Sequence, residues 1–306
     1  MKQKKNEMYL VMGFVLAVGS IGAFAKPFAE GPYLGQTPPG STAQVFAPEL
    51  ICDTRLHQIE AWGTFSADGN TFCFNRCGYV YIAENTDQSW TTPKRIKSIP
   101  FMTASCCPSA DANSIYFMYS YDPSKRYCLH RCTRTSQGWS LPHELGSLFS
   151  DSGAFGGFSV AADNSIYFWC WERAKRGAFW VAPFVDNTWS EVMEIPVNVD
   201  GNLRGHHPGI APDESFLVFY SVKPGAERGT ETNLYLILRR ADGTWTKPQN
   251  MGPKINTRYF EWGARISPDK KYMFFTRSNG WGMNSSSDTG DIYWVELKKY
   301  LPESCR

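Results

Sequence analysis

The chain has 306 residues, of which 42% are hydrophobic and 20% are charged. This composition excludes an intrinsically disordered protein and suffices for one large domain or two ordinary ones. Aromatic residues reach 15%, and there are 26 Gly and 19 Pro. Because aromatic side chains suit pleated surfaces and Gly and Pro suit tight turns, the composition favours a β-rich chain over a helical bundle.

Residues 1–25 have the pattern of a secretory signal peptide. Three Lys lie within the first five positions, an uncharged apolar run covers 8–25, and the run ends in the small-residue pattern A-x-A before Lys26. The alternative is an uncleaved membrane anchor, since the run is near the length that spans a bilayer. The Gly and Ser residues within the run and the small residues at its C-terminal end favour cleavage by signal peptidase. We therefore predict a periplasmic or secreted protein without stable membrane insertion after cleavage.

The expected mature chain is formally neutral. Residues 1–25 contain three of the 31 basic and one of the 29 acidic side chains, which leaves 28 of each. The mature chain has no excess of basic residues with which to bind the phosphates of a nucleic acid, so we predict no nucleic-acid partner. We interpret residues 26–42 as a Pro/Gly-rich linker, 43–300 as a single domain and 301–306 as a C-terminal tail.

Five segments of the chain repeat one pattern, in which an apolar stretch leads into a turn with Asp and a second apolar stretch follows. The turn residues are Asp68, Asp111, Asp163, Asp213 and Asp269, at spacings of 43, 52, 50 and 56. A strand–turn–strand unit at this period is typical of propeller blades. The Asp side chain can accept a hydrogen bond from a following amide, so we interpret the five Asp as turn caps.

A second repeat places a Trp-led segment after each unit. These segments are WTTP at 90–93, WSLP at 139–142, WSEV at 189–192 and WTKP at 245–248. We interpret them as outer strands, because an edge strand tolerates Pro. The third strands are expected at 79–83, 127–131, 179–182, 234–238 and 291–296.

The last copy has no Trp-led segment of its own, and residues 43–51 have the shape of one. We therefore predict an all-β, five-bladed β-propeller of four-stranded antiparallel blades, closed by an N-terminal outer strand; the alternative is six blades.

The fifth copy resembles the TolB-type (Pro-Asp, WD-like) propeller repeat. The resemblance rests on ISPD at 266–269, with EWG at 261–263 before it and GDIY at 290–293 after it. It covers residues 43 to 297 and implies a propeller fold. The family includes periplasmic binding scaffolds, enzyme accessory domains and some polysaccharide lyases, so the resemblance does not by itself select a function.

All nine Cys follow the signal peptide, in what should be an oxidising compartment, so disulfides are expected. Cys73 and Cys77 flank a hairpin turn and are close enough to pair, and a disulfide between Cys52 and Cys305 would lock the closure, while the connectivity as a whole stays open. Cys106 and Cys107 could form a vicinal ring or remain two separate thiols. A zinc site is the weaker alternative in this compartment, and we predict no metal site and no cofactor.

Candidate site residues gather at one mouth of the expected ring, opposite the repeated Asp turns, where the sequence varies between blades. The predicted ligand-binding residues are Glu60, Trp169, Trp171, Arg173, Arg204, His206, His207, Glu261 and Trp262. For a carbohydrate ligand, the aromatic faces can stack on sugar rings, and Arg or Glu can hydrogen-bond hydroxyl or carboxylate groups. The same residue types can also bind a protein loop that enters the channel.

Each polar candidate also has a structural interpretation. Adjacent residues on a strand point to opposite faces, so at most one of His206 and His207 faces the channel, and structural His is favoured over a metal ligand or base. Glu60 and Glu261 lie at matching places, eight residues before the turn Asp. They could form a hydrolase's carboxylate pair, although repeat residues that satisfy nearby amides are favoured.

The sequence thus favours an exported binding scaffold that takes a carbohydrate or protein ligand at its variable mouth. The alternative is a polysaccharide-acting enzyme, a metal-assisted lyase or hydrolase that uses His and Glu groups at the same mouth. A third possibility is a purely structural scaffold in an envelope assembly. The sequence identifies no catalytic residues.

Overall fold

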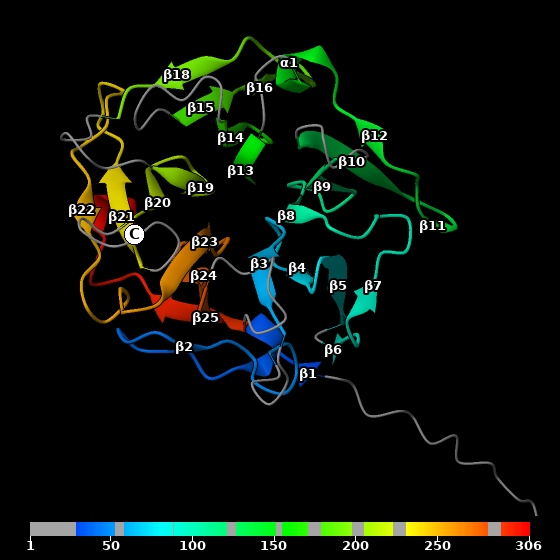
Figure 1. The fold of residues 1–306 in the computed structure, drawn as a ribbon, viewed down its shortest axis with the longest axis horizontal. Coiled ribbons are helices and arrows are strands. Elements are labelled where there is room, and N and C mark those ends of the chain that lie inside the picture. The colour runs from blue at the N-terminus through cyan, green and yellow to red at the C-terminus, as the bar shows by residue number, and fades with distance from the viewer. Residues whose placement is uncertain are drawn as a thin grey trace, which may run out of the picture.

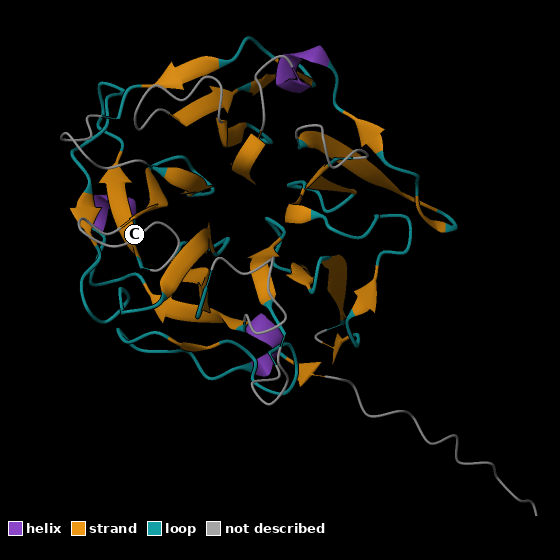
Figure 2. Cartoon of the chain, viewed as in Figure 1, coloured by secondary structure: helices purple, strands orange, loops and turns teal. Residues whose placement is uncertain are grey.

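The structure is a computed structural model, and it describes residues 29–52, 58–87, 89–120, 127–150, 155–170, 179–197, 205–222, 231–280 and 289–306. Five small antiparallel sheets stand around a common axis, which confirms the predicted five-bladed propeller (Figure 1). Nearly all regular structure is strand (Figure 2). The short helices are η1 (Pro32–Gly35), α1 (Ser147–Ser150) and η2 (Glu303–Cys305). No helix in the described ranges is both long and apolar enough to span a membrane.

Each blade has its first strand innermost (Figure 1), and the strands follow one another outward in chain order except in blade 5, whose outer strand is β2. Blade 1 contains β3 (Glu60–Phe65), β4 (Thr71–Arg76), β5 (Tyr79–Thr86) and β7 (Lys94–Arg95). Blade 2 contains β8 (Ala104–Pro108), β9 (Ser114–Tyr119), β10 (Cys128–Thr135) and β12 (His143–Glu144). Blade 3 contains β13 (Phe155–Val160), β14 (Ile166–Cys170), β15 (Phe179–Ala182) and β18 (Met193–Ile195). Blade 4 contains β19 (His206–Ile210), β20 (Phe216–Val222), β21 (Thr232–Leu238) and β22 (Gln249–Asn250). Blade 5 contains β23 (Phe260–Ile266), β24 (Tyr272–Ser278), β25 (Gly290–Glu296) and β2 (Gln44–Val45).

The ring is closed by the N-terminal strand, as predicted. Gln44 and Val45 of β2 pair with Trp294 and Tyr293 of β25, and Figure 1 shows β2 beside the last strand of the chain. The pairing is shorter than the predicted 43–51, because the backbone turns after Val45 and Phe46 points into the core with no exposed area. Blade 5 therefore draws its outer strand from the other end of the chain, which joins the N-terminal segment to the last blade and closes the ring.

The Trp-led segments do not form the outer strands themselves, which corrects the predicted positions. The Trp residues instead end short hairpins: β6 (Ser89–Trp90), β11 (Gly138–Trp139) and the pair β16 (Phe184–Val185) with β17 (Thr188–Trp189). Trp245 makes a single bridge to Arg239. Pairing resumes only after the Pro, or after Val192 in blade 3. Pro lacks the N–H that a ladder requires, and in all four blades the outer strand starts four residues after the Trp.

The repeated Asp residues cap the turn between the first and second strands of every blade. In each, Oδ1 accepts a hydrogen bond from the backbone N–H two residues on, at 2.8 to 3.2 Å. Ser66, Ser109 and Ser267 also donate their hydroxyls to the Asp of their own turn. These turns make one face of the ring regular, and the opposite face is the variable mouth.

The segment before the ring also packs onto the fold. β1 (Ala29–Glu30) pairs with β6, and Trp90 donates from Nε1 to the carbonyl of Gly31 at 2.7 Å. Leu34 is 1% exposed. Part of the segment interpreted as a linker therefore contacts blade 1.

The cysteine pairings predicted from sequence are not formed among the described residues. The Cys73 sulfur is buried 3.4 Å from that of Cys106 in the neighbouring blade. Cys77 lies exposed in the following turn, with φ of 47°. Cys52 contacts the backbone of Ile292, whereas Cys305 packs in a different core cluster. Cys73 and Cys77 do not pair because closeness in sequence does not decide which side of a blade a side chain faces, and Cys52 and Cys305 do not pair because they lie in different core clusters.

Candidate functional site

Every inner strand contains a β-bulge at the same level of the ring. The register shifts lie between Ala61 and Thr64, Ala104 and Cys106, Phe155 and Gly157, His206 and Gly209, and Trp262 and Arg265. A bulge adds a residue to one strand and changes the direction of its side chains, and bulges are common beside functional sites. The five bulges surround the central channel, since the inner strands stand nearest the axis in Figure 1.

Two sets of five residues follow from the repeat. The mouth-side ring is the set six residues before each turn Asp: Trp62, Ser105, Gly157, His207 and Gly263. The turn-side ring is the set four residues before it: Thr64, Cys107, Ser159, Gly209 and Arg265. The mouth-side ring lies within the bulges and the turn-side ring lies nearer the Asp turns, so each ring holds one residue from every blade at one level of the channel.

Aromatic side chains close the channel at this level, and we call them the aromatic floor: Trp62 and His207 of the mouth-side ring, and Trp262, which precedes Gly263 of that ring. The rings of Trp62 and His207, from blades on opposite sides of the channel, lie 4.7 Å apart. Trp262 meets Trp62 edge to face at 4.9 Å. Trp62 and Trp262 are 2% and 3% exposed, so their faces are covered by one another and by their neighbours.

The aromatic floor is held in an unusual backbone conformation. Trp62 has φ of 61° and His207 has φ of 48°, and the matching Gly263 has φ of 65°. Glycine accepts positive φ without cost, but bulky residues rarely adopt it. Gly157 leaves the space that His207 fills, since a Cβ there would lie 2.6 Å from the His207 ring. Strained backbone of this kind clusters at functional sites.

The two adjacent histidines have different environments, as the strand geometry predicts. His206 stacks on Tyr220 at 5.1 Å and lies 4.3 Å from the ring of Trp169, between blades 3 and 4. His207 alone joins the aromatic floor. Burial, together with His206 and Arg265, holds the pKa of His207 well below its usual value, so the imidazole is neutral. Its Nδ1 is buried and has no hydrogen-bond partner among the described residues.

Glu60 and Glu261 each form an ion pair with an Arg of their own blade and do not form a carboxylate pair with one another. Arg76 donates to Glu60 from Nε at 3.0 Å, and Arg277 donates to Glu261 at 2.9 Å. Both carboxylates are fully buried. Each Arg also donates to a backbone carbonyl of the loop that leads into its blade, at Ile51 or Ile255. Two equivalent clips thus tie the inner strand, the second strand and the preceding loop together, in support of the structural interpretation.

Glu261 has a further polar contact. Thr257 donates from Oγ1 to its Oε1 at 2.5 Å and from its backbone N–H to Oε2 at 3.3 Å. Burial nonetheless raises the pKa of Glu261, although Thr257 and Arg277 both favour its charged form.

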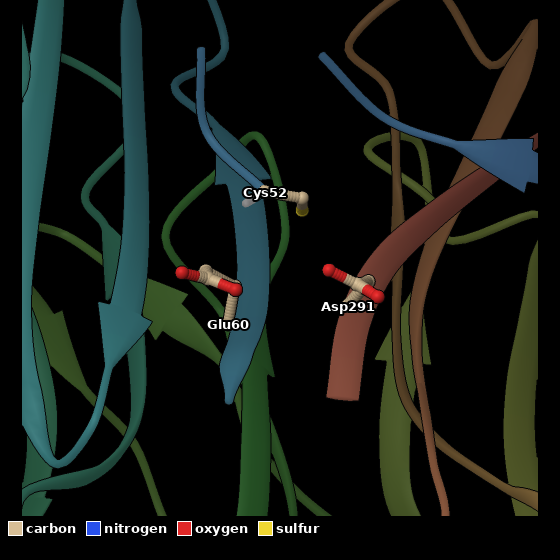
Figure 3. Close-up of side chains that lie close together, drawn as sticks. All are labelled: Cys52, Glu60 and Asp291. Atoms are coloured by element: carbon tan, nitrogen blue, oxygen red, sulfur yellow. The ribbon is translucent and has the colours of Figure 1, made fainter. Parts of the chain in front are cut away.

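Cys52, Glu60 and Asp291 bring three potential metal ligands together at the ring closure. Their ligand atoms lie within 4.8 Å of one another (Figure 3). The donor set fits a metal poorly. Arg76 already occupies Glu60, and burial with the two nearby carboxylates raises the pKa of Cys52, which keeps it a thiol rather than the thiolate that metals prefer. Cys52 also accepts a hydrogen bond from the N–H of Ile292 at 3.3 Å, a packing role.

The predicted site residues therefore separate into groups. His207 and Trp262 meet in the aromatic floor, His206 and Trp169 pair beside it, and the two Glu residues belong to the clips. Trp171, Arg173 and Arg204 lie outside the described residues. Trp62 and Arg265 were not predicted from the sequence. For Trp62 a signal was present, because Gly157 and Gly263 occupy the matching position in two other copies and indicate a backbone conformation suited to glycine.

No known family profile and no curated protein matches the sequence. Solved structures with a similar fold include a putative TolB from Agrobacterium tumefaciens, at 14% identity and a TM-score of 0.41, covering 78% of this chain and 90% of that one. TolB from Acinetobacter baumannii is similar at 8% identity and a TM-score of 0.47, covering 79% and 55%. An auxiliary nutrient binding protein from Bacteroides thetaiotaomicron is similar at 13% identity and a TM-score of 0.46, covering 83% and 59%. We therefore derive a function from the chain's own residues.

Proposed function

We propose that the protein is exported and binds a protein or peptide ligand at the variable mouth of its propeller. The observation that carries the proposal is the set of large apolar side chains exposed on this rim. Phe101 and Met102, in the loop before blade 2, are 52% and 53% exposed, and Tyr259, before blade 5, is 38% exposed. Aromatic residues, Met and Arg are enriched in protein interfaces, and Trp, Tyr and Arg supply most binding hot spots.

The exposed side chains before blade 2 are held in place by their neighbours. The Phe101 ring packs on Tyr79 at 4.8 Å, and the Arg95 guanidinium lies 3.6 Å from the Tyr79 ring centre. Met102 has φ of 62°, a conformation that a non-glycine residue rarely adopts. Side chains fixed before binding lose little entropy on binding, which favours their use as anchors.

The loop before blade 5 offers the same chemistry. Arg258 donates to the Tyr259 hydroxyl at 3.2 Å, and its guanidinium lies 5.2 Å from the Tyr259 ring centre. Behind both loops, the aromatic floor of Trp62, His207 and Trp262 lies at the base of the mouth. A peptide side chain that enters the mouth would meet apolar anchors at the rim and aromatic side chains at its base.

The carbohydrate and enzyme alternatives have less support in the described residues. Trp169 and Trp262 are buried, so they present no open face to a sugar ring. Glu60 and Glu261 are each engaged by an Arg, which leaves no carboxylate pair for hydrolysis. Trp171, Arg173 and Arg204 remain predicted contacts of the mouth loops.

Export is the part of the proposal that rests on residues 1–25. The mature protein is expected to begin at Lys26, because cleavage follows the A-x-A pattern. N-terminal sequencing of the protein recovered from outside the cytoplasm tests this. A product that still begins at Met1 would contradict it.

The binding proposal is tested with a phage-displayed peptide library selected on the immobilised protein, followed by fluorescence polarisation of the selected peptides. Phe101→Ser and Tyr259→Ser should each weaken the Kd at least tenfold. Leu141→Ser is the matched control, because Leu141 is 80% exposed but lies at the outer edge of blade 2. If the mouth variants bind normally, or if Leu141→Ser weakens binding as much as they do, the mouth is not the site. A polysaccharide array probed with the same variants tests the carbohydrate alternative.

A further inference from the structure

The turn-side ring contains a buried positive charge without a counter-charge. Arg265 is 2% exposed, and no carboxylate among the described residues forms an ion pair with it. Burying an isolated charge is strongly unfavourable unless the charge is paired and hydrogen-bonded. Burial of this guanidinium therefore destabilises the folded protein unless an anion from solution binds beside it.

The guanidinium spans the channel and retains donors for such an anion. From blade 5 it reaches Ser105 Oγ of blade 2 at 2.8 Å and the carbonyl of Phe158 of blade 3 at 2.7 Å. A third bond goes to the carbonyl of Ala264. These bonds use three of its five N–H groups, and the buried Nε has no partner. One face lies over the Trp62 ring, 5.0 Å from its centre, so the remaining donors are fixed in direction.

Arg265 lines a cavity of about 40 Å³ on the turn side of the channel. This is room for about three water molecules, at roughly 10–15 Å³ each, or for one small ion. Thr64, Cys107 and Ser159 of the same ring also line it, and the described lining residues include no Asp or Glu. Ser159 Oγ accepts a bond from the N–H of Ile210, which leaves its own O–H to donate. Burial raises the pKa of Cys107 to about 11, so its sulfur supplies no negative charge.

We propose that this cavity binds a small oxyanion: inorganic phosphate, sulfate or a short carboxylate. The N–H groups of Arg265 that the protein leaves unpaired and the hydroxyls of Thr64 and Ser159 would donate to its oxygens, Thr64 in exchange for its present hydrogen bond to Cys107, and the anion would neutralise the guanidinium. Charge-assisted bonds from Arg to an oxyanion are among the strongest hydrogen bonds in proteins. The site is separate from the mouth, with the aromatic floor above it, and it does not depend on the binding function proposed there.

The opening of the cavity favours small anions. It is lined by the residue before each turn Asp, namely Ala67, Ala110, Ala162, Pro212 and Pro268. The turn Asp residues follow these five residues in sequence and bring negative charge to this face of the ring. Lys270 pairs with Asp213 and Lys271 with Asp269, and salt screens the remaining charge beyond about 8 Å. Such a rim repels an extended polyanion but leaves a path for a single small ion.

The test is calorimetry and thermal denaturation of the purified protein with sodium phosphate, sulfate or acetate at constant ionic strength. We expect a saturable rise in Tm with at least one of the three anions. Arg265→Met should abolish it, and Thr64→Val, which removes one donor at constant shape, should weaken the Kd at least fivefold. Thr276→Val is the matched control, because Thr276 is also a buried Thr with an unpartnered hydroxyl but lies in β24, outside the cavity lining. Its Kd should equal that of the wild type.

The arms of the experiment distinguish the source of the ligand. Saturation by phosphate or sulfate alone indicates a tetrahedral inorganic ion, and saturation by acetate alone indicates a carboxylate. The proposal is overturned if the wild type shows no saturable shift with any of the three, or if Thr64→Val and Thr276→Val bind equally well. If Arg265→Met does not fold, a wild-type crystal soaked in the anion that raises the Tm replaces that variant. Electron density for the anion within hydrogen-bond distance of Arg265 supports the site, and a cavity without the anion overturns the proposal.

Discussion

Arg277 donates from Nε to the buried carboxylate of Glu261, its partner in the neighbouring strand, and Arg76 makes the same bond to Glu60 in blade 1. In both pairs the two residues are 16 apart in sequence. This repetition in adjacent blades identifies the pairs as structural clips, and it gives the first prediction.

Glu261→Gln should lower the free energy of unfolding by about 3 kcal/mol, since removing one partner of a buried ion pair leaves the other charge uncompensated. Glu84→Gln is the matched control, because Glu84 pairs with Arg134 and both side chains are about one third exposed. It should cost less than about 1 kcal/mol. Urea denaturation measures both. Equal losses in the two variants would show that the Glu261 pair is no clip.

The ring closure predicts a large effect at Phe46. This side chain follows β2, is fully buried, and lies 5.0 to 5.2 Å from the rings of Phe72, Phe274 and Trp294. Phe46→Ala should cost about 3–5 kcal/mol. Phe101→Ala, at a half-exposed Phe, should cost about 0.5 kcal/mol or less. A truncation that begins at Asp53 should lose the cooperative thermal transition of the full ring. Retention of the full Tm by that truncation would mean that β2 does not close the ring.

The neutral His207 predicts a pH dependence of stability. Its pKa lies well below the ordinary value of 6.5 in the folded protein, so the unfolded chain binds a proton that the folded chain does not. Stability should therefore fall as the pH falls below about 6.5, by up to about 1.4 kcal/mol per pH unit until the folded pKa is reached. His207→Asn, which tolerates positive φ and does not titrate, should flatten the curve between pH 6.5 and 5. Parallel curves for the two proteins would contradict the burial of a neutral imidazole.

Thiol reactivity tests the cysteine arrangement. Cys77 is exposed, whereas Cys52, Cys73, Cys106 and Cys107 are buried. Maleimide labelling of the native protein, mapped by mass spectrometry, should modify Cys77 well before those four. If Cys77 resists labelling until a reductant is added, Cys77 is held in a disulfide, which contradicts its assignment as a free, exposed thiol.

The fold could be predicted because the sequence contains five copies of one strand–turn–strand pattern. The Asp turns and the spacing of the strands identify five blades, and the missing outer strand of the last copy points to residues 43–51. The outer strands were misplaced by a few residues, because Trp and Pro mark the hairpin before the strand rather than the strand itself.

The site was less predictable, since it depends on contacts across the channel. Trp62 meets His207 from the opposite side of the ring, and Arg265 reaches Ser105 from 160 residues away. No local pattern encodes such contacts. The inner-strand bulges were also hidden, although Gly157 and Gly263 at the bulge position are their one local trace.

The central claim, that the ligand binds at the variable mouth, is tested most directly by hydrogen–deuterium exchange with a peptide selected on the wild-type protein. The account predicts slower amide exchange on binding in the loops at 99–103 and 256–260, which carry Phe101 and Tyr259, and unchanged exchange in the five Asp turns. Protection confined to the Asp turns or to the outer strands, with the two mouth loops unaffected, would contradict it.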